Sequence, residues 1–327
     1  MRQHHITTAL LALAMAIAPA FAENPPDREA PPLRIVVSVP AGGISDRVAR
    51  LLAERLQPGL SRPVVVENKA GAGGRIAVDV LMRSAPDGST VLLVPIIVPV
   101  IGPLVFKDLN YNPTRDMAPV SQVAIYQLAL AVAANHPART LREFVAWAKA
   151  NSRQATFGTP AAGSLAHFLG VALGRESGTE LVHVPYQGAA QLEIDLIGGE
   201  VACGIAALSD LAPRHREGRI RILATSGAER SLLLPTVPTF REQGFETVEA
   251  TGWHAVYAPA ATPAPVIDRL SAAIVVALET PELRAKLVAL GLEPTGTTPK
   301  QLASIMAADT AHWVPIIKAA GFNAPRQ

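Results

Sequence analysis

The sequence predicts an α/β protein with two lobes, and three observations lead to that fold class. The β-branched run 35–39, the turn 40–43 and an apolar-periodic helix begin a strand, glycine-turn, helix pattern. The same pattern starts again further along the chain, after residue 134. Two long uncharged runs, at 120–134 and 251–261, flank the second set and are typical of buried strands that cross between lobes.

The first lobe continues in the same alternation. Its opening helix places apolar residues from Val48 to Leu56 on one face, and a strand at 63–68 follows. The glycine-rich turn 71–74 leads into a second helix, and 90–94 is a third strand without polar alternation. Strands separated by helices in this way predict a parallel sheet that is covered on both faces.

The second lobe and the C-terminal segment complete the prediction. We expect helices at 140–150, 165–173 and 191–197, strands at 155–157, 181–184, 201–205 and 221–225, and C-terminal helices at 266–278, 281–290 and 299–318 that return to cover the first lobe. The predicted boundaries are therefore 33–124 plus 253–327 for lobe 1 and 125–252 for lobe 2, with 23–32 as a flexible proline-rich lead-in.

The first 22 residues predict export. Arg2, the apolar run 6–17 and the small residues at 20–22 match the three sections of a secretory signal peptide that is cleaved after Ala22. The run is too short to span a bilayer, and no Cys stands at the cleavage point to carry a lipid. We expect a periplasmic protein, and removal of Arg2 lowers its net charge from +2 to +1.

Composition excludes several classes of function. A net charge so close to zero does not favour nucleic acid or an anionic membrane surface, and 5% aromatic residues do not suit a base-stacking surface. Cys203 is the single cysteine, so no intramolecular disulfide can form. The histidines are scattered without a metal-binding motif, and residues 71–74 lack the spacing of a dinucleotide fingerprint, so we expect no metal and no cofactor.

Two helix starts are the candidate binding groups. Free backbone N–H groups at the start of the first helix, together with the helix dipole, form a seat for a carboxylate. The segment 158–164 precedes a second such helix, although Ser164 is also well suited to act only as its N-cap. In a molecule with two lobes and a cleft, both helix starts can face one small acid.

Five ordered segments resemble landmarks of the Bug-type periplasmic receptors of tripartite tricarboxylate transporters. They cover essentially the whole mature chain and are Pro40–Asp46, Val64–Gly74, Ala85–Gly88, Val184–Gly188 and Tyr257–Pro263. The resemblance implies a type II periplasmic binding fold, in which two α/β lobes joined by two crossing hinge strands close on a small carboxylic acid. It also implies a monomer that works with integral membrane transporter subunits.

The resemblance further implies a set of ligand-binding residues. They come from the first loop, the second loop with its helix, the segment before a further helix start, and the end of a strand, and are Ala41, Gly42, Gly43, Ser45, Asp46, Thr159, Ala162, Gly163, Ser164, His167, Tyr186, Gln187 and Ala206. Asp46 suits a turn brace better than contact with an anion, and His167 can equally be a packed helix residue.

Two departures from the family pattern bear on the ligand. The run 94–102 is apolar where Thr, Ser and Asn are frequent, and Ala206 stands where an acidic or amide residue is common. Both changes remove polar partners from the expected cleft wall, and an unpaired buried ammonium is costly. The sequence therefore predicts a ligand that has an apolar portion and no ammonium group.

Two other functions remain as alternatives. A periplasmic sensor subunit needs the same closing cleft, and the sequence does not separate sensing from transport. An exported hydrolase has less support, because neither loop has a Gly-x-Ser-x-Gly elbow and the spacing of Ser164 and His167 is common in helices. We therefore expect a protein that is not an enzyme.

Overall fold

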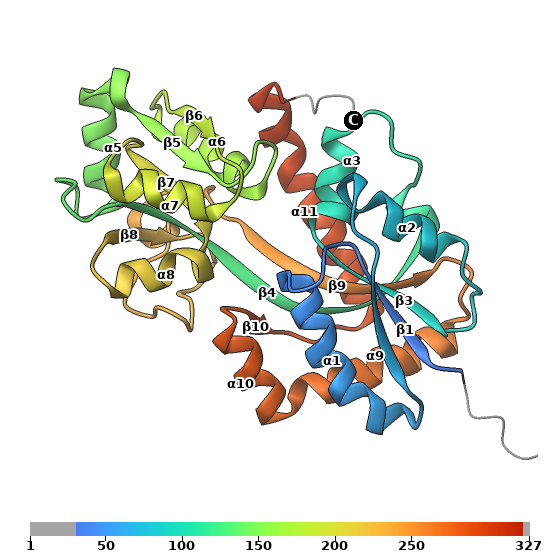
Figure 1. The fold of residues 1–327 in the computed structure, drawn as a ribbon. Coiled ribbons are helices and arrows are strands. Elements are labelled where there is room, and N and C mark those ends of the chain that lie inside the picture. The colour runs from blue at the N-terminus through green and yellow to red at the C-terminus, as the bar shows by residue number, and fades with distance from the viewer. Residues whose placement is uncertain (1–30, 323–327) are drawn as a thin grey trace, which may run out of the picture. The chain divides into compact units, whose positions relative to one another are not determined.

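The computed structural model describes residues 31–322, which form two sheets that share one long strand (Figure 1). The predicted leader, 1–22, and all but the last two residues of the predicted lead-in lie outside the described residues. The strands are β1 (Leu33–Val37), β2 (Val64–Asn68), β3 (Thr90–Pro95), β4 (Met117–Ala133), β5 (Thr156–Thr159), β6 (Val182–Pro185), β7 (Cys203–Ala207), β8 (Ile220–Thr225), β9 (Thr251–Pro259) and β10 (Glu293–Pro294).

The first sheet contains the parallel strands predicted for lobe 1. Its order is β2-β1-β3-β9-β4, in which β1 pairs in parallel with both β2 and β3, while β9 runs antiparallel to β3. Helix α1 (Ile44–Leu60) follows β1. The short turn η1 (Ala72–Gly74) leads from β2 into α2 (Arg75–Met82), which precedes β3. The predicted strand, helix, strand order is therefore confirmed.

Strand β4 passes from one sheet into the other. Its first part, from Met117 to Gln127, pairs antiparallel with β9, and its second part, from Leu128 to Ala133, pairs with β7 and β8. The two uncharged runs are thus paired crossing strands, as the sequence predicts. The residue boundaries of the two lobes stay a prediction.

The second sheet places β7 between β4 and β5, and β6 at its edge. Strands β5, β6 and β7 are parallel. Its helices are α5 (Leu141–Ala150), α6 (Leu165–Ser177), α7 (Ala189–Gly198) and α8 (Leu208–Arg216). Helix α8 is not predicted from the sequence, because Pro213 lies inside it and proline normally ends a helix.

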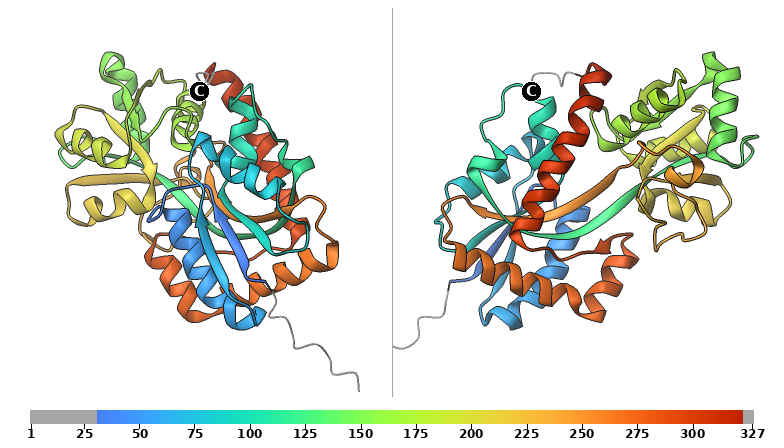
Figure 2. Two further views of the ribbon diagram at one scale, coloured as in Figure 1. Left: turned by 45° about the vertical axis from the view of Figure 1, so that its right-hand side comes forward. Right: turned by 180° about the vertical axis from the view of Figure 1, so that it is seen from behind.

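The C-terminal helices divide their contacts between the two sheets. Helices α9 (Ala264–Glu279) and α10 (Pro281–Ala289) contact α1, as predicted for helices that cover the first lobe. Helix α11 (Pro299–Ala320) contacts β4 and α3 (Gly102–Val105), but also α6 of the second sheet (Figure 2). Helix α11 therefore contacts the first lobe that it is predicted to cover and, in addition, the second sheet. Short elements complete the chain at α4 (Pro113–Asp116), η3 (Ser152–Gln154) and η4 (Arg241–Gln243).

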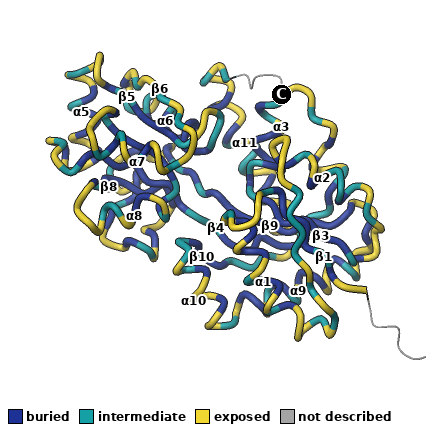
Figure 3. Tube along the Cα trace, in the orientation of Figure 1, coloured by how far each residue is buried: buried dark blue, intermediate teal, exposed yellow. Residues whose placement is uncertain are grey.

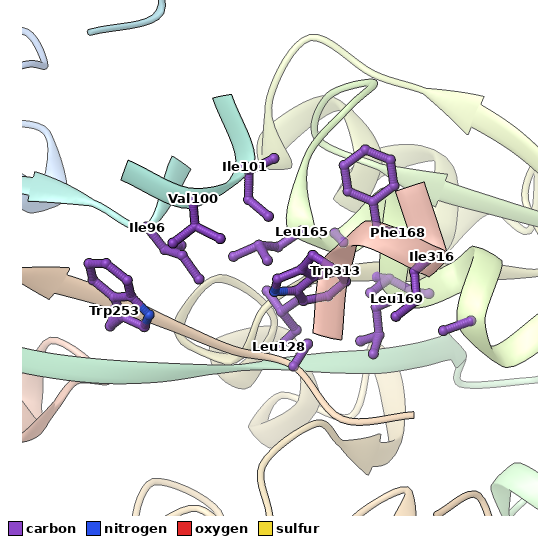
Figure 4. Close-up of a cluster of buried hydrophobic side chains, with 14 of the residues drawn as sticks. Ile96, Val100, Ile101, Leu128, Leu165, Phe168, Leu169, Trp253, Trp313 and Ile316 are labelled. Atoms are coloured by element: carbon purple, nitrogen blue, oxygen red, sulfur yellow. The ribbon is translucent and has the colours of Figure 1, made fainter. Parts of the chain in front are cut away.

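The apolar run after β3 folds as a π-helix, η2 (Ile97–Ile101), in place of the expected cleft wall. Val98, Pro99, Val100 and Ile101 are buried, and the segment contacts α11. Figure 3 shows where the buried residues lie along the trace, in dark blue. Figure 4 shows Ile101 of this segment in one apolar cluster with Leu165 of α6 and Trp313 of α11. The apolar residues of 94–102, which stand where the family often has Thr, Ser and Asn, thus pack into the core.

Candidate functional site

The start of α1 leaves backbone donors free. Gly43 is the N-cap residue and has no side chain to cap the helix. The first-turn N–H groups of Ile44, Ser45 and Asp46 have no intrahelical acceptor, and within residues 31–322 no other acceptor is found for them. Free N–H groups and the positive end of the helix dipole are the features from which the sequence predicts an anion seat, and anion binding at this loop stays a prediction.

Asp46 holds the shape of this loop. It is 2% exposed, and its Oδ2 accepts hydrogen bonds from the Gly42 N–H at 2.9 Å and from Arg50 Nε at 3.0 Å. Its Oδ1 accepts one from Asn68 Nδ2 at 2.9 Å. Burial alone would raise the pKa of Asp46, but hydrogen bonds from Arg50, Gly42 and Asn68 outweigh it and hold the pKa below its ordinary value. The bond to Asp46 also fixes Gly42 at a φ of +85°, which favours glycine.

We expect Asp46→Ala to lower the free energy of unfolding by about 2 kcal/mol, because the substitution leaves the Gly42 N–H without its acceptor. Arg50→Gln is the matched control, since the Arg50 side chain is 52% exposed and its loss should cost less than about 1 kcal/mol. Urea denaturation followed by circular dichroism measures both. An Asp46→Ala variant that is no less stable than Arg50→Gln would contradict this role.

The second loop is closed by its own side chains. Ser164 Oγ accepts the N–H of His167, so the predicted N-cap role of Ser164 is confirmed, and the same oxygen donates to the Ala161 carbonyl at 2.7 Å. The N–H of Gly163 donates to His167 Nδ1 at 3.1 Å. Ala162 is exposed. The Ser164 hydroxyl and the Gly163 N–H, two groups that could bind an acid, therefore already have hydrogen-bond partners within the loop and its helix.

His167 is a packed helix residue. It is 8% exposed, and its ring is stacked on that of His183 with 3.8 Å between centroids. Burial lowers the pKa of His167, and burial together with His167 lowers the pKa of His183 to about 4. Thr159 Oγ1 lies 2.7 Å from His183 Nε2 and donates to the Ala161 carbonyl.

Tyr186 and Gln187, which lie in the segment before α7, have different surroundings. The Tyr186 hydroxyl donates to Asp195 Oδ2 at 3.0 Å, and its ring packs beside Gly158 of β5. Gln187 is exposed.

A cavity of about 510 Å³ lies between the two sheets, at the starts of α1 and α8 and beside the crossing strands. Its volume falls within the range of small-molecule sites. The residues that line it come from α1, β4, the β7–α8 junction, the loop before η4, β9 and the segment from α10 to β10. They are Ile44, Arg47, Tyr126, Ala207, Ser209, Asp210, Ala212, Pro213, Arg216, Leu233, His254, Ala289, Leu290, Gly291 and Leu292.

The cavity includes only part of the predicted site. Two residues at this end of the first lobe line the cavity. Ile44 lies within the predicted segment 40–46, and Arg47 directly follows that segment. Among the described residues that line it, none belongs to the second loop or to the Tyr186 segment. Ala206 is fully buried in an apolar cluster, and its neighbour Ala207 lines the cavity.

Tyr126 and His254 lie at the crossing strands, on one face of the first sheet. In the β4–β9 register Ala124 stands opposite His254 and Gly252 opposite Tyr126, and opposed residues of a sheet share a face. Trp253 points to the other face, where its Nε1 donates to Asp309 of α11. The Tyr126 ring lies over Gly252, where an added Cβ would come within 2.1 Å of it, so only glycine fits there.

His254 is neutral at physiological pH. It is 1% exposed, and burial lowers its pKa to about 4. Unfolded histidine takes up a proton near pH 6.5, whereas the folded side chain stays neutral until about pH 4. The contribution of His254 to the stability of the folded protein is therefore fully present above pH 6.5 and is lost as the pH falls toward 4.

We expect this histidine alone to lower the free energy of unfolding by about 2 kcal/mol between pH 7 and pH 5. His254→Leu should remove that part of the pH dependence, and the measurement is urea denaturation of both proteins at the two pH values. An unchanged difference between pH 7 and pH 5 in the variant would contradict the buried neutral state.

Asp210 brings a negative charge to the cavity from the first turn of α8. Burial and the neighbouring Glu193 raise the pKa of its carboxyl. In the part of the chain that the structure describes, the Asp210 carboxylate forms no ion pair and accepts no hydrogen bond. An acidic residue is therefore present at the cavity although Ala206 has replaced the one that the family pattern suggests.

Comparison with known proteins decides the family. The sequence model of the tripartite tricarboxylate transporter family receptor, TctC, matches residues 48–322. The chain belongs to this receptor family. The TctC relative BugT of Bordetella pertussis is 34% identical over 312 residues, which are 95% of this chain and 95% of BugT.

Solved TctC-like structures confirm the predicted type II periplasmic binding fold. A protein from R. palustris, solved with adipate, has a TM-score of 0.77 and 29% identity and covers 91% of this chain and 99% of its own. MatC from Rhodopseudomonas palustris, with bound malate, has a TM-score of 0.72 and 26% identity and covers 88% of this chain and 99% of its own. The chain thus has two α/β lobes, a cleft and two crossing hinge strands, and its family is one of receptors, to which the periplasmic binding protein BugD is similar.

Sequence reasoning missed the six polar residues that line the cavity between the two sheets, which are Arg47, Tyr126, Ser209, Asp210, Arg216 and His254. His254 is the one histidine in an otherwise uncharged run, and Asp210 is the first acid after β7, so both carry a signal in the sequence. Over residues 31–322 no group of three or more His, Cys, Asp or Glu side chains is placed to hold a metal ion, and no helix there is long and apolar enough to cross a membrane.

Proposed function

We propose that this chain is a periplasmic receptor that binds a small carboxylic acid between its lobes and delivers it to the membrane subunits of a tripartite tricarboxylate-type transporter. The observation that carries the proposal is the uncapped start of α1 at the edge of the cavity, where Ile44 and Arg47 line the wall. Free N–H groups and a guanidinium at one end of a small cavity suit a carboxylate. Adipate and malate in the solved relatives support that ligand class.

The proposed contacts of the first loop follow from its geometry. Ala41 and Gly42 are exposed, Gly43 is half-buried, and Ser45 is buried. The carboxylate would lie on the backbone of this loop, and Asp46 would act by holding the loop in shape. Repulsion between two carboxylates argues against direct contact of Asp46 with the ligand.

The second loop would act on closure of the cleft. Thr159, Ala162, Gly163, Ser164 and His167 would then contact the other end of the ligand, with Tyr186, Gln187 and the Ala206 segment beside them. Closure excludes water, which strengthens each contact to the anion in the lower local dielectric. The ligand would shift the receptor toward the closed state by binding it more tightly than the open one.

The receptor would act in the periplasm after its export. We propose cleavage after Ala22 and a monomeric mature protein in the periplasm, without nucleic-acid partners and without a cofactor. The transporter subunits would recognise the closed form. Uptake of labelled ligand by a strain that lacks the gene, compared with wild type, distinguishes transport from sensing, and normal uptake in that strain would contradict the transport role.

A calorimetric screen of mono-, di- and tricarboxylic acids tests the receptor function. We expect one acid to bind at one molecule per chain and to be recovered unchanged after prolonged incubation. Conversion of the acid to a product would identify an enzyme. Failure of every acid to bind would contradict the proposed ligand class.

A further inference from the structure

A second cavity lies beside α11, the helix that packs on the Trp253 face of the first sheet. Its volume of about 600 Å³ exceeds that of the cavity between the two sheets and lies within the range of small-molecule sites. Its walls come from η2 and α3, the segment around α4, the start of β4 and α11, and α3 and α11 lie side by side in Figure 1. The two cavities share no lining residue. We call this second space the α11 cavity.

The α11 cavity has a closed floor. Pro99, Val100, Pro113, Met117 and Met306 line it and are buried. They come from four separate segments of the chain, which the folded core holds together. The floor is therefore formed by the fold and does not depend on a single loop.

The rim of the cavity is open to solvent along α11. Ala303, Ala307 and Ala311 recur every four residues, so they lie on one face of the helix, and all three are exposed. Each side chain is a single methyl group and leaves the mouth of the cavity open. A molecule can thus reach the buried floor from solvent.

The polar side chains at the cavity already have partners. Asn112 Oδ1 accepts the Thr114 hydroxyl at 2.7 Å and the Thr114 N–H at 3.0 Å. Thr310 Oγ1 donates to the Met306 carbonyl at 2.8 Å. Among the described residues that line the cavity, these three are the polar ones, and none of the lining residues is charged.

The backbone of the wall is also poor in donors. Pro99, Pro103, Pro113 and Pro119 line the cavity, and proline has no backbone N–H. A carboxylate that entered would lose its hydration without gaining an opposite charge, which is costly. The α11 cavity therefore does not suit the acid proposed for the other cavity, whereas an apolar cavity does take up uncharged apolar molecules.

Two methionines indicate the kind of apolar molecule. Residues 31–322 contain three methionines, and Met117 and Met306 both line the floor of this cavity. They are 2% and 7% exposed. Methionine adapts its shape to a bound molecule, and its sulfur makes favourable contacts with aromatic rings. The floor thus favours a flat ring over an extended polar chain.

We propose that the α11 cavity is a second binding site, which takes a small uncharged aromatic molecule. The binding free energy comes from removal of the ring from water against the methionines and prolines of the floor. The inference goes beyond the receptor function and does not depend on it, because the two cavities have no lining residue in common.

A matched pair of fluorescent probes tests the inference. N-phenyl-1-naphthylamine is uncharged, and 1-anilinonaphthalene-8-sulfonate has the same rings with one sulfonate added. We expect the uncharged probe to saturate at one molecule per chain and to bind about tenfold or more tighter than the sulfonate. An excess of adipate or malate should not displace it.

Two substitutions on α11 locate the bound probe. Ala307→Phe places a ring at the mouth of the cavity and should lower the affinity for the uncharged probe by about tenfold or more. Ala319→Phe is the matched control, since Ala319 is exposed on the same helix and does not line the cavity, and it should leave the affinity unchanged. Circular dichroism checks that both variants are folded.

Three results would overturn the inference. They are absence of saturable binding of the uncharged probe, equal affinity in Ala307→Phe and Ala319→Phe, and displacement of the probe by adipate or malate. Sedimentation velocity tests a different occupant of the cavity. A wild-type dimer that Ala307→Phe converts to a monomer would assign the cavity to contact between two copies of the chain, and would also overturn it.

Discussion

Replacing Gly43 by leucine is expected to lower the affinity for the solute by about two orders of magnitude, or roughly 3 kcal/mol. Gly43 has a φ of −65° and a ψ of 162°, which any residue can adopt, so the backbone of the loop should remain. An added Cβ would already lie 3.1 Å from Val39 Cγ2 and 3.2 Å from the Pro40 carbonyl oxygen. The rest of the leucine must therefore leave toward the open side of the loop, where the carboxylate is proposed to bind.

The matched control lies in the same helix. Gly59 is exposed near the other end of α1, and an added Cβ there meets no atom within 4 Å. Gly59→Leu should therefore leave the affinity unchanged, and calorimetry with the acid identified in the screen compares both variants. Equal affinity in Gly43→Leu and Gly59→Leu would show that the solute binds elsewhere.

Replacing Trp313 by alanine is expected to lower the free energy of unfolding by about 3–5 kcal/mol. Trp313 is 1% exposed on α11, and its ring centroid lies 6.3 Å from that of Phe168 on α6 (Figure 4). The cluster around it also contains Ile96 and Ile101 from the segment after β3. Because the lost side chain touches elements of both sheets, the cavity that it leaves should weaken the whole described unit in one transition.

The neighbouring residue provides the control. Val314 is 43% exposed on the same helix, so Val314→Ala should cost less than about 1 kcal/mol. Guanidinium denaturation followed by circular dichroism avoids the change in tryptophan fluorescence. A loss below about 1 kcal/mol in Trp313→Ala, or two separate transitions in the wild type, would contradict the view of α11 as a shared support.

The fold could be predicted from local patterns because those patterns are strong here. Short β-branched runs that end in glycine turns and lead into amphipathic helices have few other solutions than a parallel sheet. The runs 120–134 and 251–261 predicted two crossing strands, since uncharged strands of that length need cover on both faces, and β4 and β9 pair along much of their length. Signals of this kind depend on neighbours in the sequence.

The elements that were missed depend on contacts that are distant in the sequence. Helix α8 contains Pro213, and only its packing on β8 and β4 shows that the helix continues past the proline. The run 97–101 is β-branched and contains Pro99, yet it forms a π-helix because α11 and β3 bury it. Propensity alone favours neither outcome, and tertiary packing decides both.

The candidate site was predicted in part for a similar reason. The first loop has a local signal, since glycine turns and an uncapped helix start can be recognised in the sequence. Asp210 reaches the cavity beside the start of α1 because of the β7–α8 junction, and His254 reaches it because of the β4–β9 register. Contact of the second loop with the solute stays a prediction.

Native mass spectrometry of the mature protein, purified from the periplasm, tests the central claim most directly, because tight receptors often retain their solute. The account predicts one small carboxylic acid per chain, lost from Gly43→Leu and retained by Gly59→Leu. A bound molecule without a carboxyl group would contradict the account. So would a protein that carries no acid and gains none from the carboxylate panel.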